Sequence, residues 1–408
     1  MSPTVLIQRA RRVGGRLACR TAGFKPAKAY WNWLLANWER LRRPSRIRAR
    51  PLKLTFDPTN YCNLRCPLCP TGLKMHDRAA GHADASMFGR LLEEVGDYVF
   101  FIDFFNWGEP LLNLNVEELL AAAHHKAIST RVSTNFGIKL SDDRIRSLIE
   151  SGLNELIVSL DGASQETSGT YRRGVDFALV MENMRRMVQM KRELGARTPW
   201  IIWRYLVFRF NESEMPEAER LAAELGVDEL AFAAPYLDDG WMGSLPMPEE
   251  ERAKMHDWEP LNPRYQLFER TKSDGIRLKA QARKRHRCDW HYISTAINID
   301  GAVAPCCSVF EMKNDFGVLG PDEGDRYMEV VNNQRFISVR DRFAGRRKEP
   351  TGLVCDDCPT PDVWNFGRRV NRGIAAISLV QPFVATLRWI SRCLCKPVRR
   401  SASFHPTV

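Results

Sequence analysis

The sequence predicts an α/β fold: a partial, TIM-like (β/α)6 barrel followed by a small cysteine-rich domain. Between Leu52 and Ala234, strand-like apolar runs alternate with amphipathic helical patterns, as is typical of parallel βαβ units. The runs at 99–105 and 157–160 are mostly apolar, as expected of strands covered on both faces. A cluster of cysteines then falls in a stretch rich in Gly and Asp, residues 288–358.

Six strands and five helices are expected in the barrel. The strands are 53–56, 99–106, 130–134, 155–160, 200–208 and 229–234, and the helices are 87–98, 116–127, 142–151, 177–194 and 214–225. Right-handed crossovers would curl these units into an open barrel or leave an open sheet. In either arrangement the functional residues belong at the carboxyl ends of the strands.

The chain divides into five expected segments. They are a basic helical N-terminal extension (1–51), the barrel (52–235), a connector rich in Gly, Pro, Met and charge (236–287), the cysteine-rich domain (288–360) and a basic amphipathic tail (361–408).

Composition excludes several classes of protein. The 408 residues are 44% hydrophobic and 27% charged, which is too apolar for a disordered chain. No uninterrupted run of about 20 apolar residues is present, which argues against a membrane span. Arginines at 9, 11, 12 and 16 interrupt the N-terminus, so a secretory signal is not expected. Eleven cysteines in a cytoplasmic chain indicate metal or redox chemistry.

The net charge of +11 is concentrated at the two ends. Residues 1–53 carry +13 and residues 360–408 carry +7, leaving the body at −9, so no nucleic-acid partner is expected. The apolar stretch Gly373–Ile390, with arginines on both sides, fits either a helix packed on the protein's own body or a peripheral helix at the inner face of a membrane. The tryptophans between 31 and 38 leave the same two interpretations open.

Cys62, Cys66 and Cys69 form a C-x3-C-x2-C loop directly after the first strand. Thiolates select zinc or iron–sulfur clusters, and a closed site needs four ligands. Three ligands leave one iron of a [4Fe–4S] cluster open to a small molecule. The alternative is a zinc loop with a distant fourth ligand.

This loop resembles the hallmark motif of the radical S-adenosylmethionine (SAM) superfamily. The resemblance implies that Cys62, Cys66 and Cys69 hold a [4Fe–4S] cluster whose open iron binds SAM. It also implies one-electron cleavage of SAM to a 5′-deoxyadenosyl radical, with a reducing partner such as flavodoxin or ferredoxin. Leu68 departs from the family, which usually has an aromatic residue before the third cysteine.

Motifs at the next strand ends extend the resemblance to about 52–234. The segment 106–110 resembles the family's Gly-Gly-Glu-Pro motif, although alone it could be an ordinary turn. The polar residues that end the third and fourth strands could also cap the following helices. By resemblance, the SAM-binding residues are Gly108, Glu109, Pro110, Ser133, Thr134, Asn135, Ser159, Asp161, Arg172 and Asn211, with Arg173 as a competing partner of the SAM carboxylate.

A second set of cysteines comprises Cys288, Cys306, Cys355 and Cys358, with an Asp300-Gly301 hairpin turn before Cys306. Four thiolates suit either structural zinc or a fully ligated [4Fe–4S] cluster. The pattern resembles the shortened SPASM ("twitch") domain of radical SAM enzymes, which implies one auxiliary [4Fe–4S] cluster. The surplus thiol, Cys307, is a weak candidate for acid–base catalysis, and a buried spectator is the alternative.

The resemblance implies an oxidoreductase-type enzyme that abstracts a hydrogen atom from its substrate. An auxiliary cluster like that of aminocyclitol dehydrogenases favours net oxidation of a small-molecule, sugar or lipid-linked substrate. The alternative is a ribosomal-peptide maturase of the same superfamily, although residues 1–53 are too short for the peptide-recognition module that such enzymes often carry. A distant alternative is a non-catalytic zinc- or nucleic-acid-binding protein.

Overall fold

The computed structural model describes residues 22–75, 77–237, 257–266, 288–320 and 326–356. Shorter described pieces are 16, 19, 253–254, 268–270, 276–278, 358, 370–376 and 378. Most of the expected connector and tail, and residues 1–15, lie outside the described residues. Within the described part, no helix is both long and apolar enough to cross a membrane.

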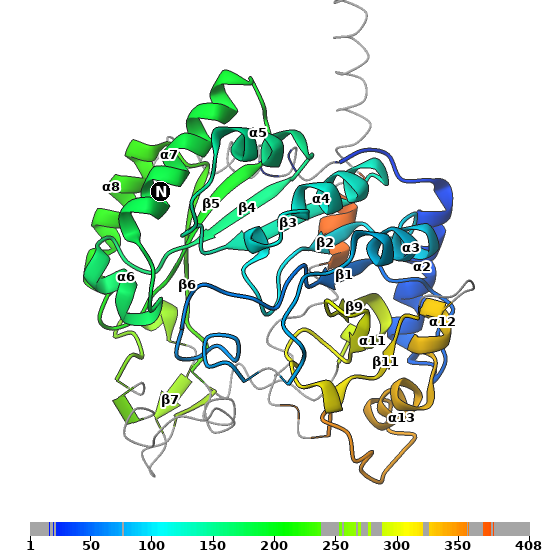
Figure 1. Cartoon of the computed structure of the whole chain (residues 1–408). Helices are drawn as coiled ribbons and strands as arrows, with labels where there is room; N and C mark the ends of the chain where they lie inside the picture. Colours follow the sequence, from blue (N-terminus) through cyan, green and yellow to red (C-terminus); the bar gives the residue numbers. More distant parts are fainter. Residues whose placement is uncertain are drawn as a thin grey trace, which may run out of the picture.

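A nine-stranded sheet organises the chain, in the order β11-β10-β9-β1-β2-β3-β4-β5-β6 (Figure 1). The strands β1 to β6 are paired in parallel in their chain order, which confirms the expected α/β class. These strands are β1 (Lys53–Phe56), β2 (Phe101–Asp103), β3 (Ser129–Thr134), β4 (Glu155–Ser159), β5 (Trp200–Leu206) and β6 (Glu229–Ala233).

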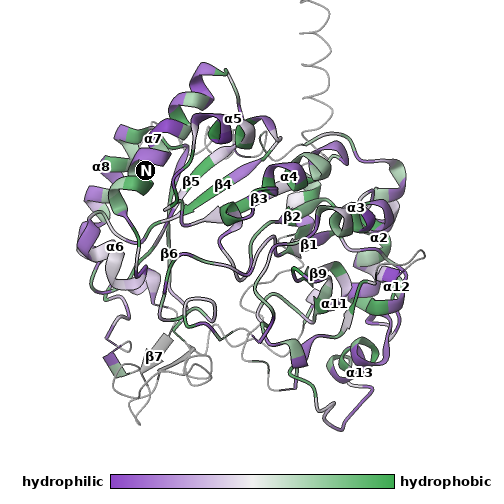
Figure 2. Cartoon of the chain, in the orientation of Figure 1, coloured by the Kyte–Doolittle hydropathy of each residue, from purple (hydrophilic) through white to green (hydrophobic). Residues whose placement is uncertain are grey.

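Helices follow the strands and pack on the outer side of the sheet (Figure 1). They are α3 (Ala85–Val95), α4 (Val116–His125), α5 (Asp142–Glu150), α6 (Gln165–Tyr171), α7 (Phe177–Glu193) and α8 (Met215–Leu225). Side chains of Asp84, Ser141, Ser164 and Asp176 accept backbone N–H groups at the starts of α3, α5, α6 and α7. Each long helix has a hydrophobic side and a hydrophilic side (Figure 2).

The small domain continues the same sheet. Its elements are α11 (Trp290–Ile293), β9 (Ser294–Ile297), β10 (Ala302–Ala304), β11 (Gly317–Val318), α12 (Arg326–Val331) and α13 (Gln334–Phe343). The predicted hairpin joins β9 to β10, and Gly301 has φ +78°, which suits glycine. β9 pairs in parallel with β1, from Lys53 opposite Ser294 to Phe56 opposite Ile297. Between the two parts, β7 (Phe268–Arg270) and β8 (Ile276–Leu278) form a separate antiparallel pair.

Helix α2 (Ala27–Arg42) precedes the barrel and contacts α11. Arg40 and Arg43 form ion pairs with Asp289, at 3.0 and 2.8 Å. The buried Glu39 accepts the backbone N–H groups of Arg48 and Ala49, at 2.7 and 3.2 Å. The ion pairs attach the N-terminal extension to the small domain, and Glu39 holds the end of the extension against α2.

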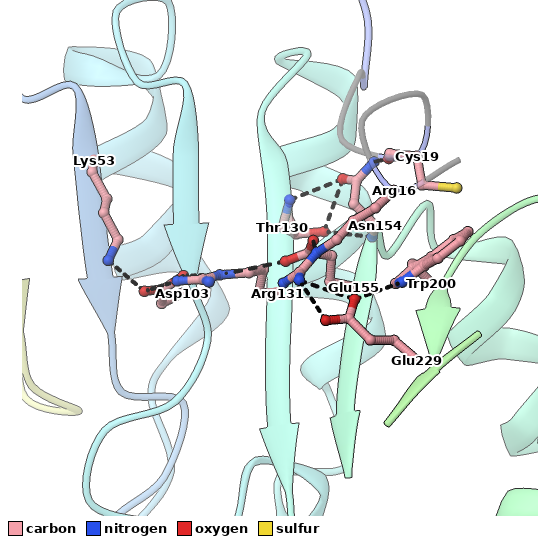
Figure 3. Close-up of polar contacts among 10 residues, drawn as sticks. All are labelled: Arg16, Cys19, Lys53, Asp103, Thr130, Arg131, Asn154, Glu155, Trp200 and Glu229. Atoms are coloured by element: carbon pink, nitrogen blue, oxygen red, sulfur yellow. Dashed lines mark hydrogen bonds and ion pairs between the residues drawn. The ribbon is translucent and has the colours of Figure 1, made fainter. Parts of the chain in front are cut away.

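A charged network crosses one face of the parallel strands (Figure 3). Asp103 of β2 accepts two hydrogen bonds from Arg131 of β3, both at 2.7 Å, and pairs with Lys53 of β1 at 2.5 Å. Arg16, from the N-terminal extension, then joins Glu155 of β4 at 2.7 Å to Glu229 of β6 at 3.0 Å. Asp103 and Glu155 are buried, so the cations replace the water these carboxylates lose on folding.

Candidate functional site

The three cysteines of the first motif lie on the loop that follows β1. Cys66 is buried, and Cys62 and Cys69 are half-buried. The Cys69 N–H donates to the carbonyl of Cys66 at 3.2 Å, so the loop turns back on itself. At Gly72 an added Cβ would lie 2.4 Å from the Cys66 carbonyl oxygen, so the returning chain needs glycine there.

The environment of these thiols suits them as ligands of a metal cluster. The pKa of Cys62 is raised to about 11 and that of Cys66 to about 12, mainly by burial and in smaller part by the negative charges of neighbouring thiolates. The Arg172 guanidinium is near enough to lower both values in part. Bound iron would displace the thiol protons and offset the cost of burying the negative charges of the resulting thiolates.

Segment 107–109, after β2, packs on the base of the cysteine loop. A Cβ at Gly108 would lie 1.8 Å from the Thr59 carbonyl oxygen, so no other residue fits. The Glu109 N–H donates to the Tyr61 carbonyl at 2.6 Å. The Thr71 hydroxyl donates to the Trp107 carbonyl. The predicted turn is therefore part of the scaffold that shapes the loop.

Glu109 joins this scaffold to the end of β3. Its fully buried carboxylate accepts from the Thr134 hydroxyl at 2.5 Å, the Asn135 N–H at 2.7 Å and the Leu111 N–H at 3.2 Å. The Asn135 amide donates to the Asn63 side chain at 2.8 Å and lies 3.8 Å from the Cys62 sulfur. Glu109, Thr134 and Asn135 are thus brought together beside the first cysteine.

The residues predicted after β4 also form one group. Asp161 is fully buried, accepts the Leu206 N–H at 2.7 Å and pairs with the Arg172 Nε at 2.7 Å. The Asn211 amide donates to the carbonyls of Asp161 and Leu206, at 2.9 and 3.0 Å. Asn211 therefore fixes the loop after β5 to the end of β4. The charge of the Arg172 guanidinium lowers the pKa of both Cys62 and Cys66.

Arg204 of β5 was not singled out from the sequence. Its Nη2 donates to the hydroxyls of Ser159 and Ser133, at 2.8 and 3.0 Å, so it joins two predicted SAM-binding residues. Its buried Nε has no hydrogen-bond partner among the described residues, and no carboxylate there lies within ion-pair distance of it. Its pKa is lowered to about 10, mainly by burial and in part by the charge of Arg172, while the charge of Asp161 acts in the opposite direction. The signal in the sequence was a single charged residue in the strand Trp200–Leu206.

The second cysteine set converges in the small domain. The charges of Cys288 and Cys355 raise the pKa of Cys306, and the charges of Cys288 and Cys358 raise the pKa of Cys355. Burial raises the pKa of Cys288 to about 12 and also raises those of Cys306 and Cys355. Trp290, Ala296 and Ala304 form an apolar core against Cys288 and Cys306.

The two cysteine sets lie toward opposite ends of β1. Cys288 precedes β9 and Cys306 follows β10, which is antiparallel to β9, so both lie toward the amino end of β1. The first motif follows the carboxyl end of that strand, whose four residues span roughly 10 Å. Cys307 is half-buried, and the charges of Lys53 and Asp103 act on the pKa of its thiol. It therefore lies beside the charged network.

No three His, Cys, Asp or Glu side chains among the described residues converge on a single metal ion. In a [4Fe–4S] cluster each thiolate binds a different iron, so the ligands stand farther apart than those of one ion. The donor chemistry of both sets, thiols with little competing oxygen, fits such clusters.

Comparisons with known proteins cover both parts of the chain. Residues 56–229 match the model of the radical SAM superfamily, and residues 288–359 match that of the SPASM iron–sulfur cluster-binding domain. A Pyrococcus furiosus protein, the tungsten-containing aldehyde ferredoxin oxidoreductase cofactor-modifying protein, is 23% identical over 335 residues, 77% of this chain and 88% of its own. The PqqA peptide cyclase of Ruegeria pomeroyi is 25% identical over 281 residues, 63% of this chain and 67% of its own. The structure of Streptococcus suis SuiB bound to precursor peptide SuiA aligns with a TM-score of 0.49 at 15% identity, over 77% of this chain and 70% of that one.

Proposed function

Because this chain belongs to the radical SAM superfamily and carries a SPASM iron–sulfur domain, we propose that it removes hydrogen from an unactivated carbon of a peptide. The cofactors of this enzyme are a [4Fe–4S] cluster with SAM and an auxiliary iron–sulfur cluster. The peptide substrate and the net oxidation are the parts that we propose.

The observation that carries the proposal is the meeting of three segments at the carboxyl ends of β1, β2 and β3. Cys62, Cys66 and Cys69 would hold the first cluster, and the buried Glu109 keeps Asn135 against their loop. When bound, the cluster and SAM supply a radical able to take hydrogen from carbon. Asp161 holds the Arg172 guanidinium near the same thiols, where its charge favours an anionic ligand.

A peptide is favoured as substrate over the small-molecule, sugar or lipid-linked substrate that the sequence first suggested. The relative from Ruegeria pomeroyi is, by its name, a cyclase of the peptide PqqA, and two thirds of it aligns with this chain. Its similarity supports the ribosomal-peptide maturase, which had been the alternative.

The arrangement of the two cysteine sets supports a net oxidation. A substrate carbon that loses a hydrogen atom must still lose one electron and one proton to become oxidised by two electrons. Cys288, Cys306, Cys355 and Cys358 would hold an electron acceptor at the end of β1 opposite the first motif. Cys307 lies there too, but burial raises the pKa of its thiol, which keeps the thiol protonated near pH 7, so another base would have to accept the proton.

Arg204 supplies a feature that the substrate would have to match. Its Nε is buried and has no hydrogen-bond partner among the described residues, and its Nη2 donates to two serine hydroxyls. A guanidinium that is partly withdrawn from water and has no described carboxylate within ion-pair distance favours a ligand that brings one. We therefore include in the proposal an acidic side chain or terminal carboxylate of the peptide bound by Arg204.

The first experiment measures 5′-deoxyadenosine released by the anaerobically reconstituted enzyme with SAM and dithionite. Release should disappear in Cys66→Ala and persist in Cys355→Ala. Synthetic peptides from short reading frames beside the coding sequence would then be tested as substrates by mass spectrometry, where a two-electron oxidation lowers the mass by about 2 Da. Full product formation by Cys355→Ala would contradict the electron-acceptor role. Release that no peptide stimulates, but that a sugar or other small molecule does, would contradict the peptide.

A further inference from the structure

Helix α2 exposes an apolar stripe on the side that faces away from the protein. Trp31, Leu34, Trp38 and Leu41, here called the α2 stripe, are 73%, 54%, 54% and 63% exposed. At 100° per residue these positions fall within an arc of about 80°, and they span about 15 Å along the helix. The opposite face already supplies the buried residues, among them Ala29 and Ala36, so the stripe is not needed to attach the helix.

The surroundings of the α2 stripe are positively charged. Glu39 is the single acidic residue among residues 1–53, and it is 2% exposed on the other face, where it binds backbone N–H groups. Arg42 follows the stripe directly and is exposed, as is the nearby Arg46. Neither arginine forms an ion pair with any residue that the structure describes. The stripe is therefore an apolar strip next to uncompensated cations.

A second segment of similar composition leaves the described structure beside α2. Residues 370–376 are helical, and the Asn371 side chain accepts from the Trp33 Nε1 at 2.8 Å and the Asn37 amide at 3.0 Å. Val370 and Ile374 are buried there. The sequence after residue 378 is mostly apolar up to Ile390 and then basic. Residues 370–376 therefore contact α2 through Trp33 and Asn37.

We propose that the α2 stripe binds the surface of an anionic lipid bilayer. The tryptophans suit the boundary between head groups and acyl chains, because the indole ring is apolar and its N–H is polar. The leucines would enter the acyl region, and Arg42 and Arg46 would meet lipid phosphates. A protein partner would need an apolar centre surrounded by acidic side chains to match the stripe and its arginines. A bilayer that contains anionic lipid offers an apolar interior and negatively charged head groups at every point of its surface. This proposal does not depend on the proposed reaction.

The test is sedimentation of the full-length reconstituted enzyme with vesicles, with no activity measurement. Phosphatidylcholine vesicles with 30% phosphatidylglycerol are compared with pure phosphatidylcholine vesicles. Trp31→Ser/Trp38→Ser should weaken binding to the anionic vesicles by about ten-fold or more. Arg42→Gln/Arg46→Gln should reduce the preference for anionic lipid. The matched control is Leu114→Ser/Leu261→Ser, which removes two equally exposed apolar side chains (77% and 61%) elsewhere and should bind like wild type.

Other occupants of the stripe give different results. If residues 379–408 or a second copy of the chain cover it, Trp31→Ser/Trp38→Ser should lower the melting temperature or change the elution volume without vesicles. Either change would overturn the proposal. It would also be overturned if wild type failed to sediment with the anionic vesicles, or if the tryptophan variant and the control bound equally.

Discussion

Replacing Asp103 by asparagine removes the central charge of the network in Figure 3. The carboxylate is 4% exposed and holds two cations, Arg131 through two bonds of 2.7 Å and Lys53 at 2.5 Å. Removing one partner of a buried ion pair costs about 3–5 kcal/mol, because the remaining charge stays desolvated. Asparagine keeps one acceptor oxygen, so we expect Asp103→Asn to lower the free energy of unfolding by about 3 kcal/mol.

Urea unfolding followed by far-ultraviolet circular dichroism at pH 7 measures this loss. Adding Lys53→Met to Asp103→Asn should recover part of the stability, since the unpaired ammonium is then absent. Glu217→Gln is the control, because it breaks an ion pair with Arg220 in which both side chains are exposed to solvent. This variant should leave the urea midpoint of unfolding unchanged. An Asp103→Asn variant within about 1 kcal/mol of wild type would refute the reasoning.

The pH dependence gives a second check on the same residue. The pKa of Asp103 lies below its usual value because the Arg131 and Lys53 charges outweigh the cost of burial. The unfolded carboxyl has a pKa of about 3.9, so the stabilisation is fully present above that pH and is lost as pH falls through the lower folded value. The difference in the free energy of unfolding between wild type and Asp103→Asn should therefore become smaller as the pH falls below about 3.9.

Three further predictions concern the site. Gly108→Ala should lower the iron bound by about four atoms per chain, because the new methyl group overlaps the Thr59 carbonyl. An iron assay measures this loss. The control is Gly89→Ala, which has open space at its Cβ and should bind iron like wild type. Burial raises the pKa of Asp57 to about 8, so the wild-type carboxyl holds its proton in the folded state up to a higher pH than in the unfolded state. The free energy of unfolding of wild type, measured with urea, should therefore fall relative to that of Asp57→Asn as pH rises from about 4 to 8. A difference between the two free energies that stays constant over this range would contradict the prediction. Arg204→Leu should abolish oxidation of a peptide substrate and weaken SAM binding no more than Ser133→Ala/Ser159→Ala does, because Arg204 holds those two hydroxyls. Equilibrium dialysis measures SAM binding, and a larger loss than in the serine variant would place the guanidinium on SAM instead.

Most of the parallel strands were predictable because they contain compact apolar runs, although β3 (Ser129–Thr134) has one apolar residue, Val132, among β-branched and polar ones. β2 is shorter than expected, Phe101–Asp103 instead of 99–106, although the apolar pattern continues through Phe105. Strand length depends on pairing, and β1 offers β2 only three partners. Helix α6 was missed because its seven residues, including Gly169, carry no apolar stripe.

The polar contacts at the site were harder to predict than the cysteines. Cysteine spacing is a local property of one loop, whereas Arg204 gains its role from Ser133 and Ser159 on two other strands. The same limit applies to Asp103 and Arg131, which meet because β2 and β3 pair in that register. Arg16 reaches Glu155 from 139 positions away, a contact that no local pattern encodes.

The pairing of β9 with β1 affects how this protein is made. A ribosome releases β1 and its neighbour β2 early, but the strand that completes the other edge of β1 begins at Ser294, about 240 residues later. Until then the edge of β1 offers free N–H and C=O groups, which invite pairing with the wrong strand. The first cysteine motif emerges right beside that edge. Assembly of the first cluster is therefore expected to succeed only after synthesis of the small domain, and a chain cut between the two parts should aggregate instead of giving two working halves.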